Sequence, residues 1–208
     1  MDRGGAEAVF ADTVRSVAKF DFLAFAETRH SIRQYASEPV PMPAIERAVR
    51  VAQQTPSSCN RQTCRVWVWT NPDDVRSVLA LQIGNRGFGD QLGGLAIITS
   101  DLSHWQTSSE RYQAWIDGGL FAMSFTYGLH AEGLGTVLLN WSVSRHQDRA
   151  LRNLIGLPDS EQVITMVGFG VIPENLTVPV SQRKPVGMAL TVNSPLLRRR
   201  SKRLSVIR

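Results

Sequence analysis

The chain has 208 residues, of which 43% are apolar, 8% aromatic and 20% charged. This composition is typical of one globular domain and excludes collagen-like, low-complexity and largely disordered chains. The formal charge is +5, but six basic residues and no acidic ones lie between 198 and 208, so the rest of the chain is close to neutral.

The basic segment 198–208 follows the last predicted strand and lacks helical periodicity. Nucleic-acid-binding domains usually carry their positive charge on a folded face or helix. We therefore expect a solvated, disordered tail here. Contact of this tail with nucleic acid or an anionic membrane is the alternative.

The cellular compartment is predicted from what the sequence lacks. It shows no export signal and no apolar run approaching the ~20 residues of a membrane-spanning helix. We expect a cytoplasmic protein whose two cysteines, Cys59 and Cys64, are reduced. Cys59 is predicted to be a buried thiol, although a position close to the functional site is the alternative.

Two helices are predicted near the start of the chain. The first covers about 8–19, where apolar residues recur at helical spacing. The second covers 22–29, because Asp21 can cap its first turn and Phe20 and Phe25 can form a hydrophobic staple across that turn.

A third helix and two strands follow. Pro43 suits the first turn of a helix with one apolar face, and Thr55-Pro56 should end that helix. The segments 66–69 and 95–99 are continuous apolar runs, which is typical of strands covered on both faces. Helices should therefore flank the sheet.

The longest predicted helix covers 110–132 and should be buried, because its apolar residues lie all around its circumference. Gly118 and Gly119 in its middle indicate close packing against another element. Either Gly133 or Gly135 should end it.

The last predicted elements are a strand over 136–139, a helix from Ser144 to Gly156 that opens with a Ser144–Gln147 capping box, and a strand over 163–171. No linker or internal repeat divides the chain. The alternation of helices and strands predicts a layered α+β or α/β domain.

Three polar segments without helical periodicity could carry the chemistry. Residues 28–33 offer two guanidinium groups and a hydroxyl, which suit a phosphate group. Residues 56–62 offer hydroxyls and two carboxamides, which can pair with the edge of a flavin or a nucleobase. Residues 181–185 add two cations. Taken singly, an exposed helix end or an ordinary turn explains the first two equally well.

In this order, Arg29, Ser31, Arg33, Asn60, Gln62 and Arg183 resemble the nitroreductase family of FMN-dependent oxidoreductases. A Gly-Leu-Gly-Thr turn at 133–136 and an Arg-Lys-Pro sequence at 183–185 add to the resemblance, which spans about 20–185. It departs from the family pattern at Thr63-Cys64 and at 140–142, where relatives often have other residues.

The resemblance implies an α+β nitroreductase-like fold, with a central, mostly antiparallel sheet flanked by helices, in an intertwined homodimer. The implied organisation is a helical extension over 1–20, an FMN-binding domain over 21–192 and a basic tail over 193–208.

The resemblance also implies the residues of an FMN site. Some would hold the phosphate, ribityl and pyrimidine groups: Arg29, His30, Ser31, Arg33, Arg183 and Lys184. Others would line the flavin ring: Pro56, Ser57, Ser58, Asn60, Gln62, Leu138, Leu139 and Asn140.

The implied activity is hydride transfer from NAD(P)H, through FMN, to a small electron acceptor such as a quinone, a nitroaromatic or an enone, in a ping-pong cycle. Phe88, Trp105 and Tyr112 are candidates for the acceptor pocket, with ordinary core packing as the alternative. No side-chain nucleophile is expected, since the cofactor carries the chemistry. No metal site is expected either, because His104, His130 and His146 have no Cys or carboxylate at metal-ligand spacing.

Two other functions are compatible with the sequence. One is a flavin-binding module without catalytic activity, docked through its basic tail onto a partner, a membrane or nucleic acid. The other is a specialised flavin-dependent biosynthetic enzyme, such as a dehydrogenase or an enzyme that fragments flavin.

Overall fold

The structure, a computed structural model, describes residues 8–193. The basic segment 198–208 lies outside the described residues. The chain divides into two compact units between Val178 and Pro179, and each unit is considered by itself.

The first unit is built on a sheet of four strands in the order β1-β2-β4-β3. The strands are β1 (Cys64–Trp69), β2 (Gly94–Asp101), β3 (Leu134–Leu139) and β4 (Glu161–Val171). All three neighbouring pairs are antiparallel, so the predicted antiparallel sheet is confirmed.

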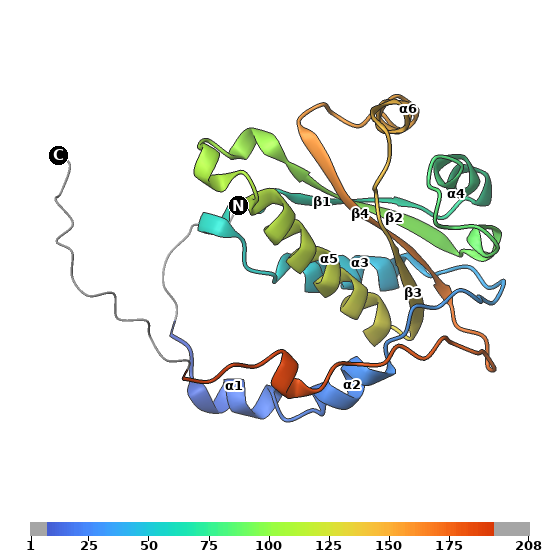
Figure 1. The fold of residues 1–208 in the computed structure, drawn as a ribbon. Coiled ribbons are helices and arrows are strands. Elements are labelled where there is room, and N and C mark those ends of the chain that lie inside the picture. Colours follow the sequence, from blue (N-terminus) through green and yellow to red (C-terminus); the bar gives the residue numbers. More distant parts are fainter. Residues whose placement is uncertain (1–7, 194–208) are drawn as a thin grey trace, which may run out of the picture. The chain divides into compact units, whose positions relative to one another are not determined.

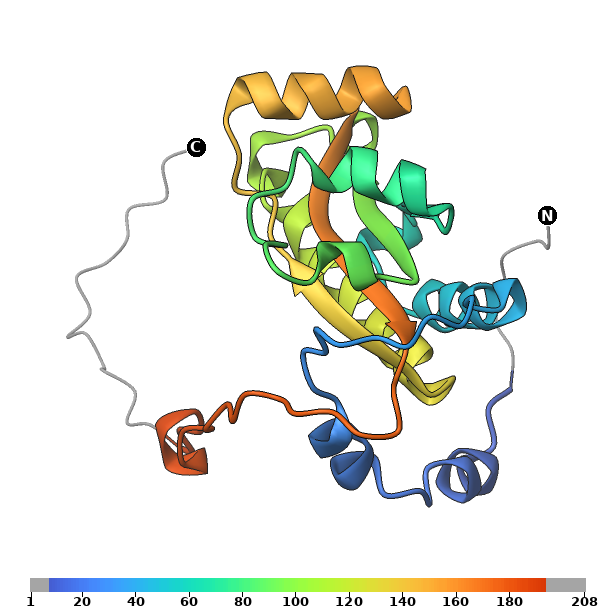
Figure 2. The ribbon, with the colours of Figure 1, turned by 90° about the vertical axis from the view of Figure 1, so that its right-hand side faces the viewer.

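Helices cover both faces of this sheet (Figure 1). On one face lie α3 (Met42–Gln53) and α5 (Gln113–Ala131), and on the other lie α4 (Pro72–Leu79) and α6 (Arg145–Ile155). Figure 2 shows α4 and α6 from a second direction. Alternate residues of β2 point into two separate cores, Ala96 and Ile98 toward α3 and α5, and Leu95 and Ile97 toward α4 and α6.

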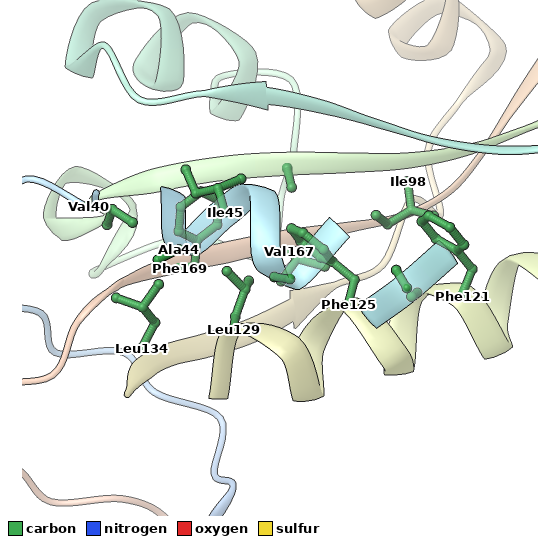
Figure 3. Close-up of a cluster of buried hydrophobic side chains, with 14 residues drawn as sticks. Val40, Ala44, Ile45, Ile98, Phe121, Phe125, Leu129, Leu134, Val167 and Phe169 are labelled. Atoms are coloured by element: carbon green, nitrogen blue, oxygen red, sulfur yellow. The ribbon is translucent and has the colours of Figure 1, made fainter. Parts of the chain in front are cut away.

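The core between the sheet and α3 and α5 depends on a close approach of these two helices (Figure 3). A Cβ on Gly128 would lie 2.6 Å from the Cα of Ala48, so α5 needs a glycine there. The predicted close packing at Gly118 is confirmed, because a Cβ there would lie 2.6 Å from Ile164. The same prediction for Gly119 is wrong in the single chain, since no other element lies within 4 Å of its Cβ position.

Local capping signals placed several helix ends correctly. The Asp21 carboxylate accepts a hydrogen bond from the Ala24 amide at 2.9 Å at the start of α2 (Phe22–Thr28). The rings of Phe20 and Phe25 lie 6.3 Å apart across this turn. The Ser144–Gln147 capping box opens α6, and Gly156 ends it with a φ of +66°.

Other boundaries differ from the predictions. The first helix, α1, is shorter and covers Ala11–Val17. The long helix begins at Gln113 rather than at 110, because a capping box of Thr107 and Glu110 closes a separate 3₁₀ turn first. α4 was not predicted, although the Asn71 side chain caps it by accepting hydrogen bonds from two backbone amides.

The prediction that the long helix is buried all round is wrong for one face of α5. Tyr112, Trp115, Ile116 and Leu120 are between 48% and 61% exposed in the single chain. A second apolar surface lies on α1 and the start of α2, where Phe10, Val17 and Leu23 are also largely exposed. None of the described helices is long and apolar enough to cross a membrane.

The contact between α3 and α5 gives a test of the core. Gly128→Val should lower the free energy of unfolding by about 2 kcal/mol or more, because the added side chain overlaps the backbone of α3. Urea denaturation followed by circular dichroism measures this. Glu46→Ala, on the exposed side of α3, should change stability by no more than about 0.5 kcal/mol. Equal stability of the two variants would contradict this packing.

Candidate functional site

The first group of predicted site residues is the arginine segment, Arg29–Arg33, which follows α2. The Ile32 amide donates a hydrogen bond to the Thr136 carbonyl at 2.9 Å, and Ser31 forms a parallel bridge with Thr136. Ile32 is only 5% exposed. Because side chains alternate along an extended segment, Ser31 and Arg33 face away from Ile32 and its core contacts.

The arginine segment and the residue that it bridges on β3 each carry a buried donor without a partner. Among the described residues, Arg29 Nη1 and Thr136 Oγ1 are buried and make no hydrogen bond. Buried polar atoms are rarely left unsatisfied, because each costs about 1 to 3 kcal/mol. A guanidinium group and a hydroxyl without protein partners are donors that suit an anionic, phosphate-like group.

Tyr35 stabilises the C-terminal end of the arginine segment. Its hydroxyl donates to the Ile32 carbonyl at 2.6 Å, and burial raises the pKa of this phenol, so it stays neutral. The guanidinium carbon of Arg33 lies 5.8 Å from the ring centroid of Phe88.

The second group is the carboxamide loop, Pro56–Gln62, which follows α3. Its backbone is left-handed at Cys59, Asn60 and Gln62, with φ values of 53°, 52° and 49°. Asparagine tolerates this conformation better than most residues, but each non-glycine residue there carries a cost of about 1 kcal/mol or more. Such a loop persists only where its surroundings hold it.

Asp117 of α5 is one of the groups that hold the loop. This carboxylate is 3% exposed and accepts hydrogen bonds from the Ser58 amide at 3.0 Å and from the Gln113 side chain at 2.8 Å. Within the loop, the Gln62 amide donates to Ser57 Oγ at 3.0 Å. No sequence pattern indicated this role of Asp117, because the role depends on a contact between remote segments.

Arg61 joins the loop to the segment before α5. Its Nη1 lies 2.5 Å from Glu110 Oε1, and its guanidinium carbon lies 4.9 Å from the Trp105 ring centroid. The other Glu110 oxygen accepts hydrogen bonds from the amides of Gln106 and Thr107. Hydrogen bonding to Arg61 is the main reason that the pKa of Glu110 is lowered to about 2.

A small cavity of about 80 Å³ opens beside the carboxamide loop. It is lined by Ala52, Gln53, Thr55, Pro56, Ser57, Gln62, Cys64, Asp117 and Phe121. Pockets for drug-sized ligands measure about 300 to 1,000 Å³, so this cavity cannot enclose a three-ring system.

The cysteines differ from the prediction. Cys59, predicted to be buried, is exposed, whereas Cys64 is half-buried. Burial raises the pKa of the Cys64 thiol to about 11, which keeps it protonated near neutral pH. Among the described residues, no three His, Cys, Asp or Glu side chains gather as metal ligands would.

The arginine segment and the carboxamide loop lie at opposite ends of α5 in the single chain (Figure 1). Ser58 is hydrogen-bonded to Asp117 near the start of α5, and Thr28 is hydrogen-bonded to His130 near the end of the helix. Between Asp117 and His130 the helix rises about 20 Å. One chain therefore does not bring the two groups to a common point.

The three candidates for an acceptor pocket are also separated. Phe88 is 8% exposed and packs in the core under α4 and α6. Trp105 and Tyr112 lie beyond the other end of β2, whose eight residues span about 25 Å. Trp105 is half-buried and Tyr112 is 61% exposed. One chain by itself therefore does not bring the three residues to a common pocket, and their part in an acceptor pocket stays a prediction.

The remaining residues predicted for the FMN site lie on different parts of the chain. His30 is exposed after α2. Leu138, at the end of β3, is 40% exposed, while the carbonyls of Leu139 and Asn140 accept hydrogen bonds from Thr165 and Gln82. Arg183 and Lys184 belong to the second unit, where Arg183 Nη1 donates to the Ser181 carbonyl at 3.0 Å.

A family model described as the nitroreductase family matches residues 26–101, which include both the arginine segment and the carboxamide loop. The resemblance to the nitroreductase family is confirmed. Among curated proteins, none matches the chain.

Solved structures extend the likeness to most of the chain. The NfrA1 nitroreductase of B. subtilis is 18% identical with a TM-score of 0.73, over 84% of this chain and 74% of that one. A Desulfovibrio desulfuricans protein in complex with FMN is 22% identical with a TM-score of 0.71, over 86% and 99% of the two chains. An FMN-dependent nitroreductase of Clostridium difficile is 19% identical with a TM-score of 0.64, over 76% and 91%. The chain has the nitroreductase fold.

The ion pair that ties the carboxamide loop of this nitroreductase fold to Glu110 should give stability a distinct pH dependence. The pKa of Glu110 is lowered from an ordinary value of 4.5 to about 2 in the folded protein, first by the hydrogen bond from Arg61 and further by the amides of Gln106 and Thr107. These contacts therefore stabilise the fold fully above pH 4.5. The contribution is lost as the pH falls toward 2. Glu110→Gln should therefore lower the urea midpoint at pH 7, and the difference from the unmodified protein should shrink steadily down to pH 3.

Asp12→Asn is the matched control, because Asp12 forms an ion pair with Arg15 that is almost fully exposed. It should leave the urea midpoint unchanged at both pH values. A Glu110→Gln difference that does not depend on pH would show that the ion pair does not hold the loop.

Proposed function

We propose that this protein is an FMN-dependent oxidoreductase that moves a hydride equivalent from NAD(P)H to a small, electron-poor acceptor such as a quinone, a nitroaromatic or an enone. When bound, FMN supplies the two-electron chemistry. The observation that carries the proposal is the buried, unpartnered guanidinium nitrogen of Arg29. Two residues later, Ser31 forms a backbone bridge with Thr136, whose buried hydroxyl is also unpartnered.

The arginine segment suits the phosphate end of the cofactor. Arg29 and Ser31 offer charged and neutral donors, and Arg33 adds a second guanidinium group from the same extended backbone. Hydrogen bonds to charged groups contribute about 1.5 to 3 kcal/mol each, more than neutral ones. We propose that His30, which follows Arg29 directly, also belongs to this end.

The carboxamide loop suits the ring end. The side chains of Asn60 and Gln62 each present one acceptor and two donors, the pattern that pairs with the carbonyl and ring-nitrogen edge of a flavin. Both residues are exposed, and the hydrogen bonds of Asp117 and Ser57 hold the backbone that carries them. Pro56, Ser57 and Ser58 would line the ring, and 138–140 would cover another part of it.

We further propose that the protein works as a homodimer in which each FMN is held by two chains. The α5 residues that anchor the two polar groups, Asp117 and His130, are separated by a helical rise of about 20 Å, and the cavity of about 80 Å³ is too small for the ring. The exposed apolar faces of α5 and of α1–α2 are surfaces that a second copy would bury. An antiparallel pair of chains would bring the arginine segment of one to the loop of the other.

The chain's own side chains would bind and orient rather than react. The thiol of Cys64 is held protonated by burial, and its neighbour Asp117 is occupied by hydrogen bonds from Ser58 and Gln113. We propose that NAD(P)H and the acceptor occupy one site in turn, and that Trp105 and Tyr112 contribute to it. Stacking of flat substrates on a flat ring needs aromatic walls more than a catalytic base.

FMN affinity tests the proposal. Arg29→Ala should weaken FMN binding by about 1 to 3 kcal/mol, because a phosphate loses its charged donor. Quenching of flavin fluorescence during titration of the purified protein measures the dissociation constant. Arg15→Ala, an exposed arginine on α1, should leave it unchanged.

Two further results bear on the same proposal. A protein that binds no FMN on reconstitution would overturn it entirely. A protein that binds FMN but oxidises neither NADH nor NADPH with any quinone or nitroaromatic acceptor would overturn the enzymatic part alone.

A further inference from the structure

His130, near the end of α5, makes an unusual set of contacts with the helix that precedes the arginine segment. Its Nε2 lies 3.2 Å from the Phe25 carbonyl and 3.0 Å from Thr28 Oγ1, and its ring centroid lies 4.8 Å from that of Phe25. Thr28 Oγ1 itself donates to the Phe25 carbonyl at 2.9 Å. The Phe25 carbonyl is therefore contacted both by Thr28, one turn later in α2, and by His130 from α5.

These contacts fix which nitrogen carries the proton. A carbonyl oxygen only accepts hydrogen bonds, and the Thr28 hydroxyl proton is already directed at it. Nε2 must therefore be protonated and shared between the Phe25 carbonyl and the Thr28 oxygen. Burial, together with the charges of Arg29 and His30, lowers the pKa of His130, so the ring is neutral near pH 7.

The hydrogen bonds to the Phe25 carbonyl cap the C-terminal end of α2. The last four carbonyls of a helix have no partner within it, and Phe25 supplies one of these carbonyls in α2 (Phe22–Thr28). Among residues 8–178, the hydrogen bonds of His130 are the only ones that link 8–28 to the rest of the first unit. The rings of Phe22 and Phe25 also pack against Tyr127 of α5, and such ring contacts are less directional than hydrogen bonds.

Arg29 comes directly after this fixed end, and the next fixed point is the bond from Ile32 to Thr136. The short stretch between them carries Arg29 and Ser31. We infer that His130 is a positioning residue for the arginine segment: by fastening the end of α2 to α5, it sets where the Arg29 guanidinium meets an anionic phosphate group. This inference rests on the proposed function, because it assigns the phosphate end of FMN to Arg29.

The test compares FMN with riboflavin, which has the same ring but no phosphate. His130→Phe keeps an aromatic ring against Phe25 and removes the N–H donor. It should raise the FMN dissociation constant about tenfold and leave that of riboflavin within about twofold, because only the phosphate contact is displaced. His130→Gln, which restores an N–H donor, should recover most of the FMN affinity.

The control is His146→Phe, since His146 is exposed on α6. It should not change either constant. If the unmodified protein binds FMN no more tightly than riboflavin, the proposed phosphate site fails, whatever the variants do. If the unmodified protein prefers FMN and His130→Phe keeps that preference, or if the variant weakens both ligands equally, the positioning role of His130 is overturned while the proposed function stands.

Discussion

The length of α5 is the constraint on which the account of the site depends. Its early part holds the carboxamide loop through Asp117, and its last part holds α2 and the arginine segment through His130. Since the helix packs against α3 and the sheet along most of its length, it acts as a rigid spacer. Two groups that suit opposite ends of one cofactor are thereby anchored at points of α5 separated by a rise of about 20 Å.

This spacing gives the exposed apolar surfaces a consistent explanation. A monomer would leave Trp115, Ile116 and Leu120 in water together with the apolar residues of α1 and α2. A second copy could cover them and would at the same time supply the missing half of each site. The proposed homodimer and the proposed FMN site therefore depend on the same geometry, and neither is complete without the other.

The carboxamide loop shows how the fold prepares a polar site. Left-handed backbone at Asn60 and Gln62 is unfavourable in isolation, and the chain offsets the cost with a buried carboxylate, a serine hydroxyl and the Arg61–Glu110 ion pair. The result is a loop whose carboxamides are exposed while its backbone is held. Such preorganisation lowers the entropy lost when a ligand binds.

The sequence predicted what depends on local chemistry. The caps at Asp21 and Ser144, the apolar face of α3 and the strands of the sheet each follow from residues close together in the chain. The start of α5 was misplaced because a capping box three residues earlier closes its own turn.

Properties that depend on remote contacts were not predicted. The roles of Asp117 and His130 arise from partners 59 and 102 residues away. The exposure of Cys59 and the core position of Phe88 likewise follow from tertiary packing. The arginine and carboxamide motifs could be found in the sequence, but their separation along α5 could not.

The most direct test of the two-chain site is complementation between two defective variants. Arg29→Glu repels the phosphate from the arginine segment, and Asn60→Asp removes the carboxamide donors of the loop without changing the shape of the side chain. When the two proteins are refolded together in equal amounts with FMN, half of the dimers are mixed. Half of the sites in these dimers combine two intact groups, so turnover of NAD(P)H with a quinone should reach about one quarter of the unmodified value. Turnover no higher than the mean of the two variants measured alone would show that each site is built from a single chain and would contradict the account.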